Sequence, residues 1–319
     1  MFPELVKSDA IGKIHVLSRK KRNTEGGEGK VVDFQVDYHN SKSLERALEG
    51  VEVVINTMGT EGDFQVAKKN LIDAAAKTGV KIYFPRYDFF KFGADRSEWG
   101  IDPQVDTWAV QHPCWDGKKA DDAYAESKGL KVIPVYVGLH MEHPVGGFQK
   151  PHGFFAEEET WYMPGTGKVP VTFTGKTDIA LSVIELIKLT LKDPNSVPAH
   201  VRIGGANNTP EEIVEIMNKA ANGKTHIKLK LLNEEETKEL FSRLVFEPPK
   251  GEEHDFDQKF MNEIATRVFT MSGGGGNLDF SKYNHNELVN PGQSKWKWKM
   301  IEDYAKETDG MPLEMEYMR

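Results

Sequence analysis

A strand–helix–strand pattern between residues 51 and 85 is the feature that most constrains the fold of this chain. Residues 51–55 form a short apolar, β-branched run of strand length. Residues 64–80 then place apolar side chains at helical spacing, and Gly79 suits the end of a helix. Another apolar strand begins at Ile82 and runs to Phe84. Two strands joined through a helix predict a parallel sheet that is covered on both faces.

This pattern also predicts where a ligand would bind. In open parallel sheets, ligands bind beyond the carboxyl ends of the strands. Residues 56–60 and 85–88 follow the two strands of the central unit, so we expect a site there. The irregular segment from Arg86 to Trp115 is rich in aromatic residues and follows the second strand, as the wall of a site often does.

The same alternation of strands and helices continues on both sides of the central unit. Residues 13–18, 31–36 and 130–136 read as strands, and 41–48 and 117–127 as helices, with Ser41 as a candidate N-cap. Residues 1–12 resemble the end of an amphipathic helix, and no strand with a glycine-rich turn precedes them. We therefore expect the sequence to begin inside the first helix of a nucleotide-binding domain.

The composition changes after His140. A glycine- and proline-rich stretch leads into short strands at 169–173, 201–203 and 228–232, and into helices near 177–191, 209–221 and 256–270, with another opening at Asn233. Thr209-Pro-Glu-Glu has the N-cap, N1 proline and acidic first turn of a helix start. The predicted fold class is α/β, a Rossmann-type doubly wound parallel sheet. Residues 1–143 would form the nucleotide-binding core and 144–319 a smaller, mostly helical substrate region.

Composition excludes several classes of function. The chain has 319 residues and a net charge of −8, which argues against general affinity for nucleic acid. No apolar run reaches about 18 residues, so we expect no membrane span. With Cys114 as the one cysteine and no secretory signal pattern, we expect no internal disulfide and a cytoplasmic location.

Several segments, taken in order, resemble the NmrA-like family of atypical short-chain dehydrogenases, which includes isoflavone-reductase-like enzymes. The segments are Val16–Arg19, Val36–Tyr38, Ser43–Ile55, Gln65 with Ile72–Ala76, Thr177–Ala180 and Thr209–Ile213. The resemblance covers nearly the whole chain. It implies an extended Rossmann fold that binds NADP(H).

The resemblance also implies a set of cofactor contacts. Arg19, with Lys20 beside it, would recognise the ribose 2′-phosphate, although by local sequence alone Arg19–Arg22 is equally a solvated basic turn. The other implied contacts are Thr57, Met58, Gly59, Gln65 and Pro85. The family's Gly-x-x-Gly-x-x-Gly turn is absent from this sequence, so we expect the dinucleotide to bind weakly or not at all.

In the reductases of this family, a lysine that opens the helix before the sixth strand serves in catalysis, and Lys118 matches that position. Such a lysine can bind the nicotinamide ribose or a carbonyl oxygen and assist proton transfer. The pocket would be lined by Tyr87, Phe92, Trp115 and His140. Without the resemblance, Lys118 is an ordinary exposed lysine at a helix start.

Three other patterns have plainer interpretations. His140 and His143 suggest metal ligands, but no third ligand is evident, so we expect no metal site. Tyr124 and Lys128 have the spacing of the Tyr-x-x-x-Lys pair of classical short-chain dehydrogenases, which is weak evidence near a helix end. The alternating lysines and tryptophans of 295–299 favour a segment that docks by its aromatic side chains over an anion-binding site.

Two hypotheses about function follow. In the first, the chain is an NADPH-dependent reductase of a small organic substrate, an aromatic one included. In the second, it is a non-catalytic NADP sensor that binds a regulatory protein partner. Neither hypothesis involves nucleic acid or a membrane.

Overall fold

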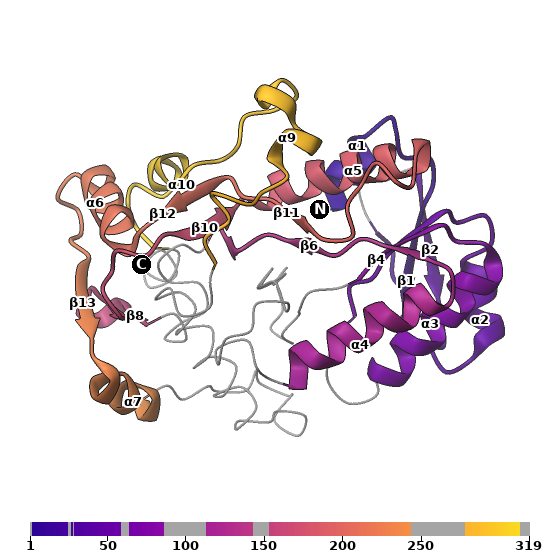
Figure 1. Cartoon of the computed structure of the whole chain (residues 1–319), viewed down its shortest axis with the longest axis horizontal. Coiled ribbons are helices and arrows are strands. Elements are labelled where there is room, and N and C mark those ends of the chain that lie inside the picture. Colours follow the sequence, from indigo (N-terminus) through magenta and orange to yellow (C-terminus); the bar gives the residue numbers. More distant parts are fainter. Residues whose placement is uncertain are drawn as a thin grey trace.

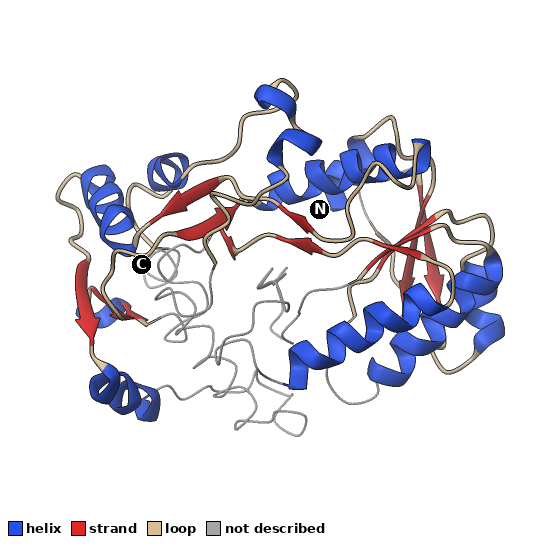
Figure 2. Cartoon of the chain, viewed as in Figure 1, coloured by secondary structure: helices blue, strands red, loops and turns tan. Residues whose placement is uncertain are grey.

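The computed structural model describes residues 2–24, 27, 29–58, 64–85, 113–142, 153–243 and 278–312. In Figure 1 the strands are spread along the long axis of the molecule. Helices α2, α3 and α4 lie at one end, and α6 and α7 lie at the other. Helices α1 (Phe2–Lys7), α5 (Lys176–Lys192) and α9 (Asn286–Val289) cover the strands in the middle of the molecule from one side (Figure 2).

The predicted strand–helix–strand unit is confirmed. Strands β3 (Val53–Ile55) and β4 (Ile82–Phe84) pair in parallel, with Val53 opposite Ile82, and α3 (Phe64–Thr78) connects them. Strand β5 (Lys131–Val132) extends this sheet beyond β4. Strands β1 (Ile14–Ser18) and β2 (Val31–Gln35) form a second parallel pair, and the helix α2 (Ser41–Ala47) follows β2.

One core cluster joins these two pieces of sheet. It contains buried side chains from α2, α3 and the strands, so the helices pack against both pieces at once. Its central members are Leu44, Val54, Leu71, Ile72, Ala75, Tyr83 and Val132, with Leu17 and Phe34 packed against it. This arrangement sets the ends of β1, β3 and β4 around α3.

The helix boundaries differ from the prediction in two places. Asn40, and not Ser41, is the N-cap of α2, because its side-chain oxygen accepts a hydrogen bond from the N–H of Ser43 at 3.3 Å. The helix α4 (Pro113–Ser127) begins four residues earlier than predicted, at a proline, which is favoured in the first turn.

The single strand predicted for residues 130–136 is two strands in the structure. Strand β5 ends at Val132, and β6 (Val135–Tyr136) pairs instead with β11 (Val201–Arg202). Pro134 lies between them and has no N–H to continue a ladder. The sheet therefore changes partners at this proline.

The second half of the chain contains more strands than the sequence pattern predicts. Strand β10 (Val171–Thr174) lies between β12 (Ala206–Asn208) and β7 (Leu139–His140). Strand β9 (Thr160–Pro164) lies between β13 (Lys228–Leu232) and β8 (Phe154–Phe155), and a short 3-10 turn, η3 (Ala156–Glu158), joins β8 to β9. Of these strands, β7, β8, β9 and β12 were not predicted.

The helices of this half are α5 (Lys176–Lys192), α6 (Pro210–Ala221), α7 (Glu234–Arg243), α9 (Asn286–Val289) and α10 (Ile301–Glu307), with a 3-10 turn η6 (Pro291–Gln293). The predicted start of α6 is confirmed, since Thr209 and Glu212 form a reciprocal capping box. None of the helices in the described ranges is long and apolar enough to cross a membrane. Residues 256–270 lie outside the described residues.

Helix α5 contributes several side chains to another core cluster. Its residues Ile179, Val183, Leu186 and Ile187 pack with the buried residues Phe84, Ile133 and Val201. Trp298 is buried in the same cluster, with Trp296 packed beside it. The prediction that the segment near residues 295–299 docks by its aromatic side chains is confirmed.

Candidate functional site

A turn of four cationic residues follows the carboxyl end of β1. Residues 19–22 are all exposed, and Arg19 and Lys20 are the first two. Nearby, the hydroxyl of Tyr38 donates a hydrogen bond to the carbonyl oxygen of Leu17 at 3.1 Å. Burial raises the pKa of Tyr38, while the positive charges of Arg19 and Arg22 act on its hydroxyl in the opposite direction.

The next residues hold this turn against β2. The N–H and hydroxyl of Thr24 donate hydrogen bonds to the two carboxylate oxygens of Asp33, at 2.7 Å and 2.6 Å. These bonds and the charge of Arg22 lower the pKa of Asp33. An exposed pair of guanidinium groups and two ammonium groups on an anchored turn is a donor set that suits a phosphate.

The carboxyl end of β3 carries a buried amide, Asn56, which is the first residue of the predicted site segment 56–60. The side-chain amide of Asn56 donates to the hydroxyl of Tyr83 at 2.7 Å, and its oxygen accepts the N–H of Met58 at 2.9 Å. Burial raises the pKa of Tyr83 far above its usual value, so its phenol stays protonated. Asn56 therefore ties the loop after β3 to strand β4, and a polar residue directly after an apolar strand was the available signal.

Helix α3 links this end of β3 to the end of β2. The side-chain amide of Asn70 donates to the carbonyl oxygen of Tyr38 at 2.9 Å. Gln65 lies exposed in the first turn of α3. The end of β1 is thus connected to α3 through Tyr38.

Helix α4 packs beside α3, and two polar ties join them. Lys68 forms a buried ion pair with Asp121, and farther along both helices Asp73 pairs with Lys128 at 2.6 Å. Tyr124 donates to the same Asp73 at 2.8 Å. Tyr124 and Lys128 therefore both bind Asp73 of α3.

The other predicted site residues are placed as follows. Pro85 is half-buried directly after β4, and His140 is half-buried at the end of β7, in a different piece of sheet. Lys118 and Trp115 lie on α4, but their side chains are outside the described part of the structure, as are Gly59, Tyr87 and Phe92.

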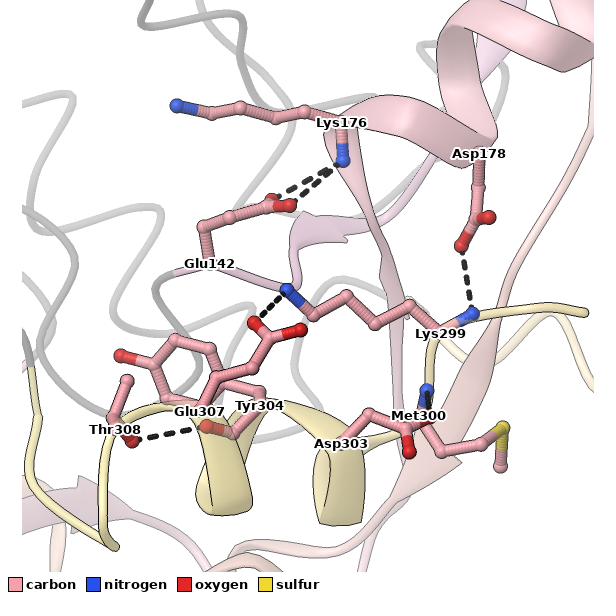
Figure 3. A network of polar contacts seen from close by, with 9 residues as sticks. All are labelled: Glu142, Lys176, Asp178, Lys299, Met300, Asp303, Tyr304, Glu307 and Thr308. Carbon is pink, nitrogen blue, oxygen red and sulfur yellow. Dashed lines mark hydrogen bonds and ion pairs between the residues drawn. The ribbon is translucent and has the colours of Figure 1, made fainter.

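A second polar cluster lies between the residues that follow β7 and the N-terminus of α5 (Figure 3). Both carboxylate oxygens of Glu142 accept the N–H of Lys176, at 3.0 Å and 3.2 Å. Asp178 is buried, and one of its oxygens accepts the N–H of Lys299 at 2.9 Å. Burial raises the pKa of Asp178 to about 6, and the charge of Glu142 adds to this effect.

The Lys299 side chain extends from this cluster toward α10. Its ammonium group pairs with Glu307 at 2.5 Å (Figure 3). Sequence reasoning missed the cluster because its bonded pairs are 34 and 121 residues apart in the chain. Among the residues that the structure describes, no group of three or more His, Cys, Asp or Glu side chains is placed to hold a metal ion.

Solved structures with the same fold include proteins of different kinds. An NADPH-dependent quinone oxidoreductase from Escherichia coli, QOR2 in complex with NADPH, superposes with a TM-score of 0.64 at 14% identity, covering 96% of this chain and 94% of that chain. The Citrobacter sp. triphenylmethane reductase with NADP(H) has a TM-score of 0.61 at 14% identity, covering 95% and 93%.

A regulator has the fold as well. The negative transcriptional regulator NmrA in complex with NADP has a TM-score of 0.62 at 15% identity, covering 99% of this chain and 93% of that chain. A search of curated proteins found no match.

A comparison of the sequence with family models shows to which family the chain belongs. The model of the NmrA-like family matches residues 16–296, which is most of the 319-residue chain. The match starts in β1 and extends through the Trp296 segment that packs against α5. This chain belongs to the NmrA-like family.

Proposed function

We propose that this chain binds NADP(H) at the edge formed by the carboxyl ends of β1, β3 and β4. The observation that carries the proposal is the exposed cationic turn at Arg19–Arg22, anchored by the bonds between Thr24 and Asp33. A 2′-phosphate needs such a charge directly after this strand, whereas a free hydroxyl would favour an acidic residue. The three NADP(H) complexes with the same fold also support it.

Each cofactor residue has a proposed role. Arg19 and Lys20 would bind the 2′-phosphate, and Thr57, Met58 and Gly59 would line the cofactor after β3. Gln65 would reach it from the start of α3, and Pro85 would border it after β4.

We propose further that the chain is a reductase of a small organic substrate. When bound, NADPH supplies a hydride. Lys118, near the start of α4, would hold the nicotinamide ribose or the substrate oxygen and assist delivery of the balancing proton. The substrate would be lined by Tyr87, Phe92, Trp115 and His140. The quinone and triphenylmethane reductases with this fold support an aromatic substrate.

The cofactor proposal is tested by calorimetric titration with NADPH and NADH. We expect NADPH to bind more tightly, and Arg19→Ala to weaken NADPH binding by about tenfold or more while changing NADH binding little, because one charge-assisted contact is lost. Lys42→Ala, at an exposed lysine on α2, is the matched control. Equal loss for both dinucleotides in the Arg19 variant would contradict the assignment.

The alternative is an NADP-sensing regulator that binds a protein partner, and the NmrA–NADP complex is the observation that favours it. Activity separates the two proposals. A reductase oxidises NADPH in the presence of a quinone or triphenylmethane dye, and Lys118→Ala lowers that rate without abolishing NADPH binding. A regulator binds NADP but turns over none of these acceptors.

A further inference from the structure

The ion pair between Lys68 and Asp121 is much less exposed than the ion pair between Asp73 and Lys128. The Lys68 side chain is 5% exposed and that of Asp121 is 20% exposed. An ammonium group removed from water is costly unless a carboxylate meets it, and breaking a buried pair by removing one partner is strongly destabilising. The relative position of the two helices is therefore constrained at this point.

The pair lies beside the proposed site and not at the far side of the helices. The pKa of Tyr83 is raised by burial and, to a smaller extent, by the negative charges of Asp121 and Asp122, so both carboxylates act on the Tyr83 hydroxyl. That hydroxyl accepts the amide N–H of Asn56, the first residue after β3. The ion pair thus belongs to a polar cluster at the carboxyl ends of β3 and β4.

Helix geometry connects this cluster to the proposed catalytic residue. Lys118 precedes Asp121 by three positions on α4, and positions three apart are neighbours along one side of a helix. A shift of α4 at Asp121 would carry the backbone of Lys118 with it. A misplacement of about 1 Å far from the chemistry can cost about a hundredfold in rate.

We propose that the Lys68–Asp121 ion pair is a positioning device that sets the N-terminal half of α4, and with it Lys118, against the carboxyl ends of β3 and β4. The proposal rests on the proposed role of Lys118. Neither Lys68 nor Asp121 touches the reacting atoms in this scheme. Each acts through the helix that it holds.

The second tie between the same helices provides a matched control. Asp73 and Lys128 pair with side chains that are 43% and 37% exposed, and Tyr124 donates to Asp73. An exposed pair contributes little to stability, typically under about 1 kcal/mol. Lys128→Met therefore removes an exposed ion pair between α3 and the residue that follows α4, without touching Asn56 or Tyr83.

The kinetic test uses NADPH with a quinone as the acceptor. We expect Lys68→Met and Asp121→Asn to lower kcat by between about tenfold and a hundredfold, with NADPH binding changed by less than about threefold. Lys68→Arg, which keeps the charge, should recover most of the rate, and Lys128→Met should stay near the wild type. A loss in Lys128→Met equal to that in Lys68→Met would overturn the proposal, because any weakened helix contact would then suffice.

A distance measurement tests the same idea without activity. Spin labels are placed on Lys42→Cys in α2 and Lys119→Cys in α4, both exposed positions, after Cys114→Ser removes the native thiol. We expect a narrow distance distribution that broadens or shifts in Asp121→Asn and Lys68→Met and is unchanged in Lys128→Met. An unchanged distribution in the first two variants would refute positioning.

The kinetic test and the distance measurement together separate this inference from the proposed function. If the wild type binds no NADPH while the label distances respond to Lys68 and Asp121, the cofactor assignment is wrong and the positioning of α4 stands. If NADPH is bound and turned over while the label distances and kcat are unchanged in the Lys68 and Asp121 variants, the cofactor assignment stands and the positioning proposal is wrong. If Lys68→Met prevents folding, Asp121→Asn and Lys68→Arg are compared with Lys128→Met instead.

Discussion

The carboxylate of Asp178 accepts a hydrogen bond from the backbone N–H of Lys299 at 2.9 Å, joining positions 121 residues apart. Asp178 lies in the first turn of α5 and is 3% exposed. The contact fixes the segment that carries Trp298 across the start of α5. Because burial and Glu142 raise the pKa of Asp178 to about 6, we expect this contact to be sensitive to pH.

The first prediction concerns that sensitivity. The pKa of Asp178 is about 6 in the fold against an ordinary value of 3.8, so the folded protein binds this proton more tightly than the unfolded chain. The contribution to stability is then present below about pH 4 and is lost as the pH rises through 6. The total is on the order of 2–3 kcal/mol. Urea unfolding between about pH 4 and pH 7 measures it.

Asp178→Asn is the matched variant for this measurement. Its amide oxygen still accepts the N–H of Lys299, but it does not titrate. We expect the difference in unfolding free energy between the Asp178→Asn variant and the wild type to grow in favour of the variant as the pH rises through 6. A difference that is flat with pH would show that Asp178 has an ordinary pKa.

Glu142 gives a second prediction, about the start of α5. The N-cap residue Gly175 makes no side-chain capping bond, and Glu142 supplies a carboxylate to the N–H of Lys176 instead. Glu142→Ala should cost about 1 kcal/mol, as the loss of an N-cap does. Thermal and urea unfolding measure this cost. Glu215→Ala, at an exposed position of α6, should change stability much less.

The same residue also allows a check of the first prediction. Glu142→Gln removes the negative charge that raises the pKa of Asp178. The pH step assigned to Asp178 should therefore move to lower pH in this variant. An unmoved step would mean that the two carboxyl groups do not interact.

A third prediction concerns Gly138, which lies between β6 and β7. Its φ is +65°, and a Cβ atom there would lie 2.3 Å from the carbonyl oxygen of Thr172. Gly138→Ala should therefore cost about 3 kcal/mol or more, from backbone strain and from the clash together. Gly129→Ala, with φ of +85° and open space around it, should cost only the strain, about 1–2 kcal/mol. Similar costs in the two variants would argue against the close approach of Thr172.

The fourth prediction concerns Asn56. Asn56→Ala removes the partners of the Tyr83 hydroxyl and the Met58 N–H at a buried position, which should cost about 1–3 kcal/mol. Because the loop after β3 loses its anchor, NADPH affinity should fall as well. Unfolding and calorimetric titration measure the two effects. Tyr83→Phe, which breaks only the bond to strand β4, should affect affinity less, and the opposite order would contradict this reading of the loop.

Local periodicity predicted the elements of the first half because each has a clear pattern. The run at Val53–Ile55, the helix Phe64–Thr78 and the strand Ile82–Phe84 all lie inside the predicted segments. The pattern could not show that the strand at 130–136 changes partners at Pro134, because pairing is set by other segments. It also missed strand β9, which pairs with β8 on one side and with the distant β13 on the other.

The candidate site was predictable only in part for the same reason. The positions after β1 and β3 follow from the position of each strand in the sequence, and Arg19, Thr57 and Met58 are found there. The ion pair of Lys68 with Asp121 spans 53 residues, and no local signal marks either residue as buried. Long-range polar pairs such as this depend on how helices pack, which a sequence pattern does not specify.

Helix α5 has one more consequence, for the order in which the chain can fold. It packs with α1 near the start of the sequence and with α9 and Trp298 near its end. Contacts between such distant residues close large loops, and a fold rich in them forms slowly. Because α5 ends at Lys192, more than a hundred further residues must be synthesised before Trp298 can pack against this helix. Until then, a ribosome-bound chain exposes an apolar surface that a chaperone would recognise.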